Sequence, residues 1–257
     1  MHSDVRDLRD FYHGSLGRVA RRMIWRGVRS VWPNVRGQTV LGLGYATPYL
    51  RSLRHEADRT IAFMPAGQGA RFWPREGPGL TTLVNEAELP LADMSIDRVL
   101  LIHSLESTEH LRPMLREIWR VLAGNGRLLA AVPNRRGLWA RADWTPFGHG
   151  NPYSPGQLKR LLADTLFVPQ HTSQVLFIPP LRSRFSLSWA PAWEKVGARW
   201  FPAFSGVTMV EARKEIFSGV SERSPRAATR LIIPFPGDAA SARTPIAEPP
   251  NAQHNGK

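Results

Sequence analysis

Residues 39–49 read TVLGLGYATPY, a short apolar run that breaks into a glycine-containing turn. Residues 89–106 read LPLADMSIDRVLLIHSLE, where an acid-containing turn leads into a second apolar run. A strand, a tight turn at a helix start and a later strand that ends in polar residues are typical of the ligand crevice of an open α/β sheet. Ligands of such sheets lie at the carboxyl ends of the strands, so both stretches indicate one site.

The remaining pattern predicts a doubly wound, mostly parallel, seven-stranded sheet. The continuous apolar run at residues 99–102 is typical of a strand that is buried on both faces. We expect strands at residues 39–43, 60–63, 80–84, 97–103, 127–132, 170–177 and 207–212. We expect helices at residues 46–54 and 188–200, and a helix after the fourth strand that ends near residue 122. A further helix begins at residue 154, where SPGQ predicts a capping box. Residues 124–126, GNG, predict the turn after the helix that ends near residue 122.

The two ends of the chain differ in composition from its middle. Residues 14–32 predict an amphipathic helix whose polar face carries Arg18, Arg22, Arg26 and Arg29. We favour a lid helix with a solvated basic face over an anion-binding arm. From residue 218 the chain is rich in Pro, Ala, Ser and Arg without periodicity, which predicts a disordered tail. The expected division is therefore an N-terminal helical segment (1–37), a central domain (38–217) and a tail (218–257).

Composition bounds the class of protein. The 257 residues are 42% apolar, which suits one sizeable domain. No apolar run is long enough to span a membrane, and residues 1–13 lack the apolar segment of a secretory signal, so a cytoplasmic protein is expected. The absence of cysteine excludes disulfides and thiol nucleophiles. The net charge of +13 favours anionic partners, although an arginine-rich composition also accompanies a GC-rich genome.

These motifs together resemble the class I S-adenosylmethionine-dependent methyltransferases, over roughly residues 40–162. The resemblance lies in the order of the glycine turn, the Leu-Pro and Asp-containing turn, LREIWRVL at residues 115–122 and GRL at residues 126–128. Residues 133–154 are similar to a bacterial branch of methyltransferase type 11-like proteins. The resemblance implies a Rossmann-like methyltransferase fold, S-adenosylmethionine as the cofactor and no metal.

The resemblance also assigns residues to the cofactor. Methyl transfer is an in-line displacement, so the protein has to align donor and acceptor. The glycine turn would approach the amino-acid end of the cofactor, Glu86 would receive the adenine amino group, and the end of the fourth strand would line the pocket. The cofactor-binding residues expected on this basis are Gly42, Gly44, Tyr45, Ala46, Glu86, Ala87, His103 and Ser104. An exposed loop carboxylate is the alternative for Glu86.

Several positions depart from the family pattern. Gly42 stands where the family has an acid before the turn, and Ala46 and Pro48 replace later turn glycines. Phe63-Met64-Pro65 ends the second strand, where an acid normally holds the ribose hydroxyls. Each lost carboxylate costs about 1–3 kcal/mol of cofactor binding.

The loop at residues 134–153 opens over the predicted site and carries the candidate acceptor-side groups. His149 is the candidate catalytic residue because a histidine with a pKa near neutral can remove a proton from the acceptor. Hydrogen bonding to backbone is the alternative for a loop histidine. Weaker candidates are His103, Asp143 and Tyr153. The aromatic residues Trp139, Trp144 and Phe147 either wall a pocket or pin the loop to the core, and we favour pinning.

Three functions are compatible with these residues. The first is methyl transfer from S-adenosylmethionine to an acceptor, more readily a small molecule than a macromolecule. The second is a catalytically inactive methyltransferase-like module for binding or assembly. The third is binding of an anionic partner, such as RNA or an acidic protein, through the basic surface that includes Arg135, Arg136 and Arg141. No RNA-binding signature is present, and the sequence does not specify the acceptor or the oligomeric state.

Overall fold

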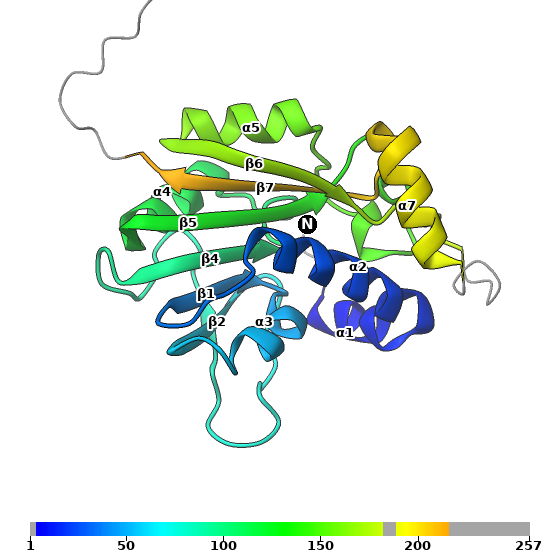
Figure 1. Cartoon of the computed structure of the whole chain (residues 1–257). Helices are drawn as coiled ribbons and strands as arrows, with labels where there is room; N and C mark the ends of the chain where they lie inside the picture. Colours follow the sequence, from blue (N-terminus) through cyan, green and yellow to red (C-terminus); the bar gives the residue numbers. More distant parts are fainter. Residues whose placement is uncertain (1–3, 182–188, 216–257) are drawn as a thin grey trace, which may run out of the picture. The chain divides into compact units, whose positions relative to one another are not determined.

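Residues 4–181 and 189–215, which the computed structural model describes, contain seven strands in one sheet (Figure 1). The strands are β1 (Thr39–Gly44), β2 (Arg59–Pro65), β3 (Thr81–Val84), β4 (Ile96–Ile102), β5 (Leu122–Pro133), β6 (Phe167–Val175) and β7 (Val207–Lys214). Their order across the sheet is β3-β2-β1-β4-β5-β7-β6. The five strands from β3 to β5 are parallel, and β7 runs antiparallel to both β5 and β6. The predicted doubly wound sheet is therefore confirmed.

The strand order reverses at β1, which carries the glycine-containing motif. β1 pairs with β2 on one side and with β4 on the other. Gly44 lies opposite Ile102, so the turn after β1 meets the end of β4. A reversal of this kind leaves a crevice at the carboxyl ends of the two central strands, which is where open α/β sheets bind ligands.

Helices cover both faces of the sheet. They are α1 (Val5–His13), α2 (Ser15–Val31), α3 (Thr47–Leu53), α4 (Leu111–Val121), α5 (Pro155–Asp164) and α7 (Ala190–Trp200), with short 3₁₀ turns η1 (Trp139–Arg141), η2 (Pro146–Gly148) and η3 (Pro202–Phe204). Side chains of α1, α2 and α3 share one core with the sheet face that includes Val40 and Leu100. Side chains of α4 and α5 share the second core with the face that includes Leu41 and Leu101. Every helix within the described ranges is too short or too polar to cross a bilayer.

The N-terminal helix predicted at residues 14–32 is α2. Its apolar face is buried and its arginines at 18, 22 and 26 are exposed, as expected of a helix packed on the domain. α1 was not predicted. Asp4 begins it by accepting a hydrogen bond from the Arg6 amide at 2.7 Å, and Leu8 and Tyr12, one helical turn apart, are buried.

The structure corrects the turn predicted at residues 124–126. α4 ends at Val121, and these three residues lie inside β5. The pairing of β5 with β4 jumps from Leu122 opposite Ile96 to Arg127 opposite Arg98. The glycines therefore serve a bulge at the start of a long strand rather than a connecting turn. The tail predicted from residue 218 and the first residue of the helix predicted at 188–200 lie outside the described residues. The domain boundaries remain predictions.

The motif at residues 115–122 has a structural role that the sequence alone does not reveal. Glu117 accepts a hydrogen bond from the amide of Leu89 at 2.9 Å. Arg120 donates to the carbonyl oxygens of Leu89 at 2.9 Å and Leu91 at 2.8 Å. These contacts fasten the segment between β3 and the start of β4 to α4.

Replacing Arg120 with alanine is expected to lower the free energy of unfolding by about 1–2 kcal/mol, because charge-assisted hydrogen bonds to the segment are lost. The exposed Arg116, on the same helix, is the matched control, and its replacement with alanine should change stability by no more than about 0.5 kcal/mol. Urea denaturation measures both. Equal losses in the two variants would contradict the fastening role.

The ion pair between Arg120 and Glu117 predicts that stability depends on pH. The hydrogen bond from Arg120 holds the pKa of Glu117 below its ordinary value. A carboxyl with a lowered folded-state pKa contributes stability above its unfolded pKa and loses it as the pH falls through the folded pKa. The parent chain should therefore lose more stability than Arg120→Ala on acidification, which denaturation curves at neutral and acidic pH would measure.

Candidate functional site at the carboxyl edge of the sheet

Gly44 makes the turn after β1 and approaches the end of β4 closely. Its φ is +88°, and a Cβ atom at this position would lie 2.4 Å from the carbonyl oxygen of Ile102 and 3.0 Å from that of His103. The amide of Tyr45 donates to the Ile102 carbonyl at 2.8 Å. Only glycine combines this left-handed backbone with such proximity, so the residue fixes the geometry of the crevice floor.

His103, the first residue after β4, is buried in a chain of hydrogen bonds. Its Nε2 lies 2.8 Å from the Tyr12 hydroxyl, and its Nδ1 lies 3.1 Å from Glu106 Oε1. Burial raises the pKa of the Tyr12 phenol well above its ordinary value, so the phenol keeps its proton. The Tyr49 hydroxyl donates to the Tyr12 oxygen at 3.2 Å. Because Tyr49 donates to the Tyr12 oxygen, the Tyr12 hydroxyl in turn donates to Nε2 of His103.

α1 lies across the carboxyl ends of β1 and β4. Leu8 and Tyr12 are 0% and 3% exposed, and the Tyr12 ring stacks on Tyr45 with 5.6 Å between the ring centroids. The amide of Val5 donates at 2.9 Å to the carbonyl oxygen of Gln68, whose side-chain amide donates at 3.0 Å to the carbonyl oxygen of His103. The helix and the loop after β2 together close the top of the crevice.

Glu86 lies at the same edge, in the turn after β3. Its side chain is 5% exposed and accepts a hydrogen bond from the Thr108 hydroxyl in the loop after β4. The alternative of an exposed loop carboxylate is therefore not what the structure shows. Ala87 follows in the same turn, where its amide donates to the Asn85 side chain at 3.1 Å.

The predicted cofactor residues lie along the carboxyl edge of the sheet, but two of them, Gly42 and Ala46, pack α3 against β1. Gly44 and Tyr45 at the end of β1, Glu86 after β3 and the His103-Ser104 pair after β4 all lie at the carboxyl edge of the parallel strands. Gly42 instead faces α3, since a Cβ there would lie 2.6 Å from the Cβ of Ala46. Gly42 and Ala46 therefore let α3 pack closely on β1.

The residues at this edge do not fit S-adenosylmethionine while α1 occupies its observed position. Tyr12 and Gln68, 3% and 1% exposed, fill the space above Gly44 and His103. Met64 and Pro65, the last two residues of β2 and likewise buried, stand where the family resemblance leads us to expect a carboxylate for the ribose hydroxyls. Three cavities of about 600, 780 and 1070 Å³ in the described residues are lined by side chains other than Gly44, Glu86 and His103, although Tyr45 lines the last of them. A cofactor placed directly over Gly44 and His103 would need the Tyr12 and Gln68 side chains to move.

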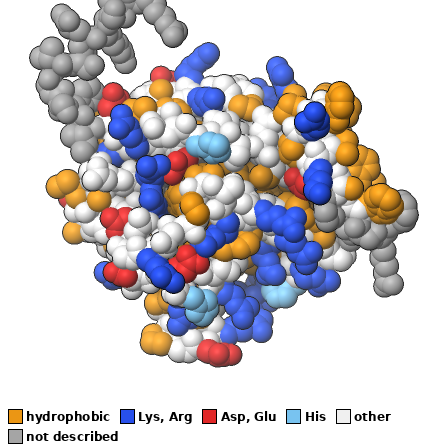
Figure 2. All heavy atoms as spheres, in the orientation of Figure 1, with side chains coloured by type: hydrophobic (Ala, Val, Ile, Leu, Met, Phe, Trp, Pro, Cys, Tyr) orange, Lys and Arg blue, Asp and Glu red, His pale blue; other side chains and the backbone are white. Residues whose placement is uncertain are grey.

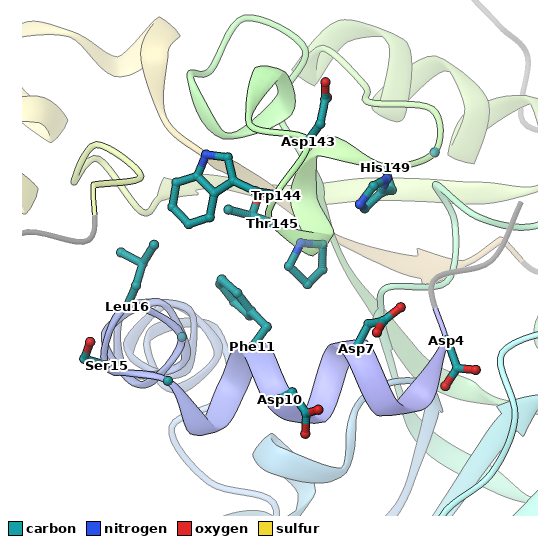
Figure 3. A pocket seen from close by; sticks show the side chains of 14 residues that line it. Asp4, Asp7, Asp10, Phe11, Ser15, Leu16, Asp143, Trp144, Thr145 and His149 are labelled. Atoms are coloured by element: carbon teal, nitrogen blue, oxygen red, sulfur yellow. The ribbon is translucent and has the colours of Figure 1, made fainter.

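His149 lies in a different cavity, on the outer side of α1 (Figure 3). The cavity measures about 780 Å³ and is enclosed by α1, the start of α2 and the loop at residues 143–150. Its titratable side chains are those of Asp4, Asp7, Asp10, Asp143 and His149. Figure 3 shows His149 facing α1 from the loop, whereas His103 is buried on the crevice side.

The aromatic residues of this loop divide between the two roles considered from the sequence. Trp139 and Phe147 are buried, and the Trp139 indole donates to the carbonyl oxygen of Ile178 at 2.7 Å, so both pin the loop to the core. Trp144 lines the cavity and is 45% exposed. Tyr153 donates to the Leu105 carbonyl oxygen at 3.3 Å and is not among the cavity's lining residues.

Sequence reasoning missed two residues of the crevice, Tyr12 and Gln68, whereas Glu106 lies in the stretch at the end of the fourth strand that was expected to line the pocket. The spacing of Leu8, Phe11 and Tyr12 is helical and could have indicated a buried helix face. Nothing local to Tyr12 indicates a partner 91 residues away. Gln68 lies in a Gly- and Pro-rich loop that carries no periodic signal.

The part of the chain that forms this edge is similar in sequence to known methyltransferases. Residues 37–130, which span β1 to most of β5, match the family model described as a methyltransferase domain. A probable S-adenosylmethionine-dependent methyltransferase of Mycobacterium tuberculosis is 37% identical over 82 residues, which are 32% of this chain and 27% of that protein. The match therefore spans about a quarter of the length of the curated relative.

Solved structures share the fold at low sequence identity. The protein in complex with the Trm112 methyltransferase activator of Haloferax volcanii gives a TM-score of 0.56 at 18% identity, covering 84% of this chain and 95% of that one. An S-adenosylmethionine-dependent methyltransferase of Thermotoga maritima gives a TM-score of 0.55 at 15% identity, covering 82% and 96%. At these identities the likeness shows the fold alone.

Proposed function

We propose that this chain is a class I S-adenosylmethionine-dependent methyltransferase, that it transfers a methyl group to a small-molecule acceptor, and that it admits its cofactor only when α1 moves. One observation carries the proposal. Gly44 ends β1 and His103 follows the adjacent β4, where the strand order reverses, and Glu86, in the turn after β3, contacts Thr108 of the loop after β4. S-adenosylmethionine, the cofactor of the family, would supply an activated methyl group there.

The chain's own residues have defined roles in this proposal. The turn at Gly44 gives a backbone surface without a side chain, and Glu86 supplies an acceptor for an amino group. His149 remains the proposed proton acceptor on the substrate side. In the observed arrangement His149 lines the cavity beside α1 while His103 is buried, so the proposal needs the movement of α1 to bring the two sides into one space.

Replacing Glu86 with alanine is expected to weaken binding of S-adenosylhomocysteine by about 10- to 100-fold, because a hydrogen bond to a charged group contributes about 1.5–3 kcal/mol. Glu88, exposed two residues later, is the matched control and should leave binding unchanged when replaced with alanine. Calorimetric titration measures both variants. Equal weakening by the two substitutions would contradict the proposed role of Glu86.

A non-catalytic binding module is the second candidate. It is favoured by the buried Met64 at the end of β2 and by the side chains that fill the crevice. If the folded chain and a variant with a loosened α1 both fail to bind S-adenosylmethionine and S-adenosylhomocysteine at millimolar concentration, the methyl-transfer proposal is overturned and the module remains.

A further inference from the structure

A groove of about 1070 Å³ lies beside the crevice, between the start of α2, α3 and the loop after β2. We call it the arginine groove. Six arginines line it: Arg18, Arg21, Arg51, Arg54, Arg71 and Arg75. Glu76 is the one acidic side chain among its described lining residues. Figure 2 shows Lys and Arg side chains gathered over the region where Figure 1 places α2 and α3.

The arginines of the groove are not neutralised by the described part of the protein. None of the six forms an ion pair with a described carboxylate; Arg18 donates instead to the backbone carbonyl of His13 at 2.7 Å. Outside the groove, Arg29 pairs with Glu56 at 2.9 Å on the same helical layer. Converging cations from three separate segments raise the local potential and attract an anion.

The inner wall of the groove is aromatic. Tyr12, Tyr45 and the half-buried Trp73 line it, so the groove shares two side chains with the closed crevice. Burial raises the pKa of Tyr45, while the charges of Arg71 and Arg21 oppose that rise. The positive field of the groove therefore reaches its inner wall.

We propose that the arginine groove binds a small ligand that carries phosphate groups, with the guanidinium groups on the phosphates and the aromatic wall on the rest of the ligand. Guanidinium groups match phosphate oxygens with paired hydrogen bonds. The volume reaches the upper end of the range of small-molecule sites and exceeds the need of a single phosphate ion. This inference goes beyond methyl transfer and does not depend on it.

Titration of the full chain with inorganic pyrophosphate tests the site. We expect saturable binding that weakens with added salt, and a loss of about 10-fold or more in Arg51→Glu and in Arg71→Glu, which change different walls of the groove. Arg112→Glu, exposed on α4 in the opposite helical layer, has the same change of charge and should bind as the parent chain does.

A second measurement distinguishes a lipid headgroup from a free phosphate compound as the ligand. Co-sedimentation with phosphatidylcholine vesicles, with and without phosphatidic acid, shows whether a lipid headgroup is preferred to free pyrophosphate; either preference supports the site. The proposal is overturned if folded chain binds neither probe or if Arg112→Glu weakens binding as much as Arg51→Glu. Tighter binding of a single-stranded oligonucleotide at the same salt would also overturn it, in favour of nucleic acid. Because the variants leave Glu86 intact, their outcome is independent of the methyl-transfer test.

Discussion

Replacing Tyr12 with alanine is expected to tighten binding of S-adenosylhomocysteine by about 10- to 100-fold, because the seated α1 competes with the cofactor for one space. The ring is 3% exposed, stacks on Tyr45 and hydrogen-bonds to His103. Truncating a buried aromatic ring costs about 3–5 kcal/mol, and part of that cost lowers the stability of the arrangement in which α1 packs over the crevice. A smaller free-energy difference between the packed and the displaced α1 leaves a larger fraction of chains open to the ligand.

Two controls separate opening of the crevice from general destabilisation. Tyr12→Phe keeps the ring and removes the hydroxyl, so its gain in affinity should lie between those of the parent chain and Tyr12→Ala. Arg6→Ala, exposed on the same helix, should leave affinity unchanged. Calorimetric titration and ligand-induced shifts in the melting temperature measure all three. Weaker binding by a folded Tyr12→Ala would show that α1 supports the cofactor site rather than closing it.

Replacing Gly44 with alanine is expected to lower the free energy of unfolding by about 2–5 kcal/mol. The left-handed backbone costs a non-glycine residue about 1–2 kcal/mol. The added Cβ would also press on the Ile102 carbonyl at 2.4 Å and on the Ser104 Cβ at 2.9 Å, and overpacking adds about 1–3 kcal/mol.

Gly37 provides a matched control, because its φ is +71° and no atom lies within 4 Å of its Cβ position. Gly37→Ala should therefore carry the backbone cost alone, about 1–2 kcal/mol. Denaturant unfolding of both variants gives the difference. Equal losses would mean that the end of β4 yields to the added methyl group and does not fix the turn.

The sequence predicted the sheet because its strands carry strong local signals. The run at residues 99–102 is apolar throughout, and the structure buries it on both faces in β4. Ser154 and Gln157 form the expected capping box at the start of α5. In contrast, the glycines at residues 124–126 fit a turn and a bulge equally well, and the choice depends on pairing with β4.

The sequence allowed us to predict which strand ends form the candidate site, but not which side chains close it. Gly44 and Glu86 follow strands whose order the motif implied, so their shared edge could be expected. The closure by Tyr12 could not, because a hydrogen bond between residues 12 and 103 depends on the path of the whole chain. The arginine groove likewise combines α2, α3 and a loop, whereas the sequence indicated a stripe along one helix and a separate basic loop at residues 135–141.

The position of β7 has a consequence for how the chain acquires its structure during synthesis. β6 is made before β7 but pairs with no other strand of the described sheet, and β7 also covers the outer edge of β5. Until residues 207–214 leave the ribosome, both strands present unpaired backbone groups, which invite pairing with other chains. A nascent chain that stops short of β7 should therefore need protection by a chaperone, and full-length chains should lose that need once the last strand is inserted.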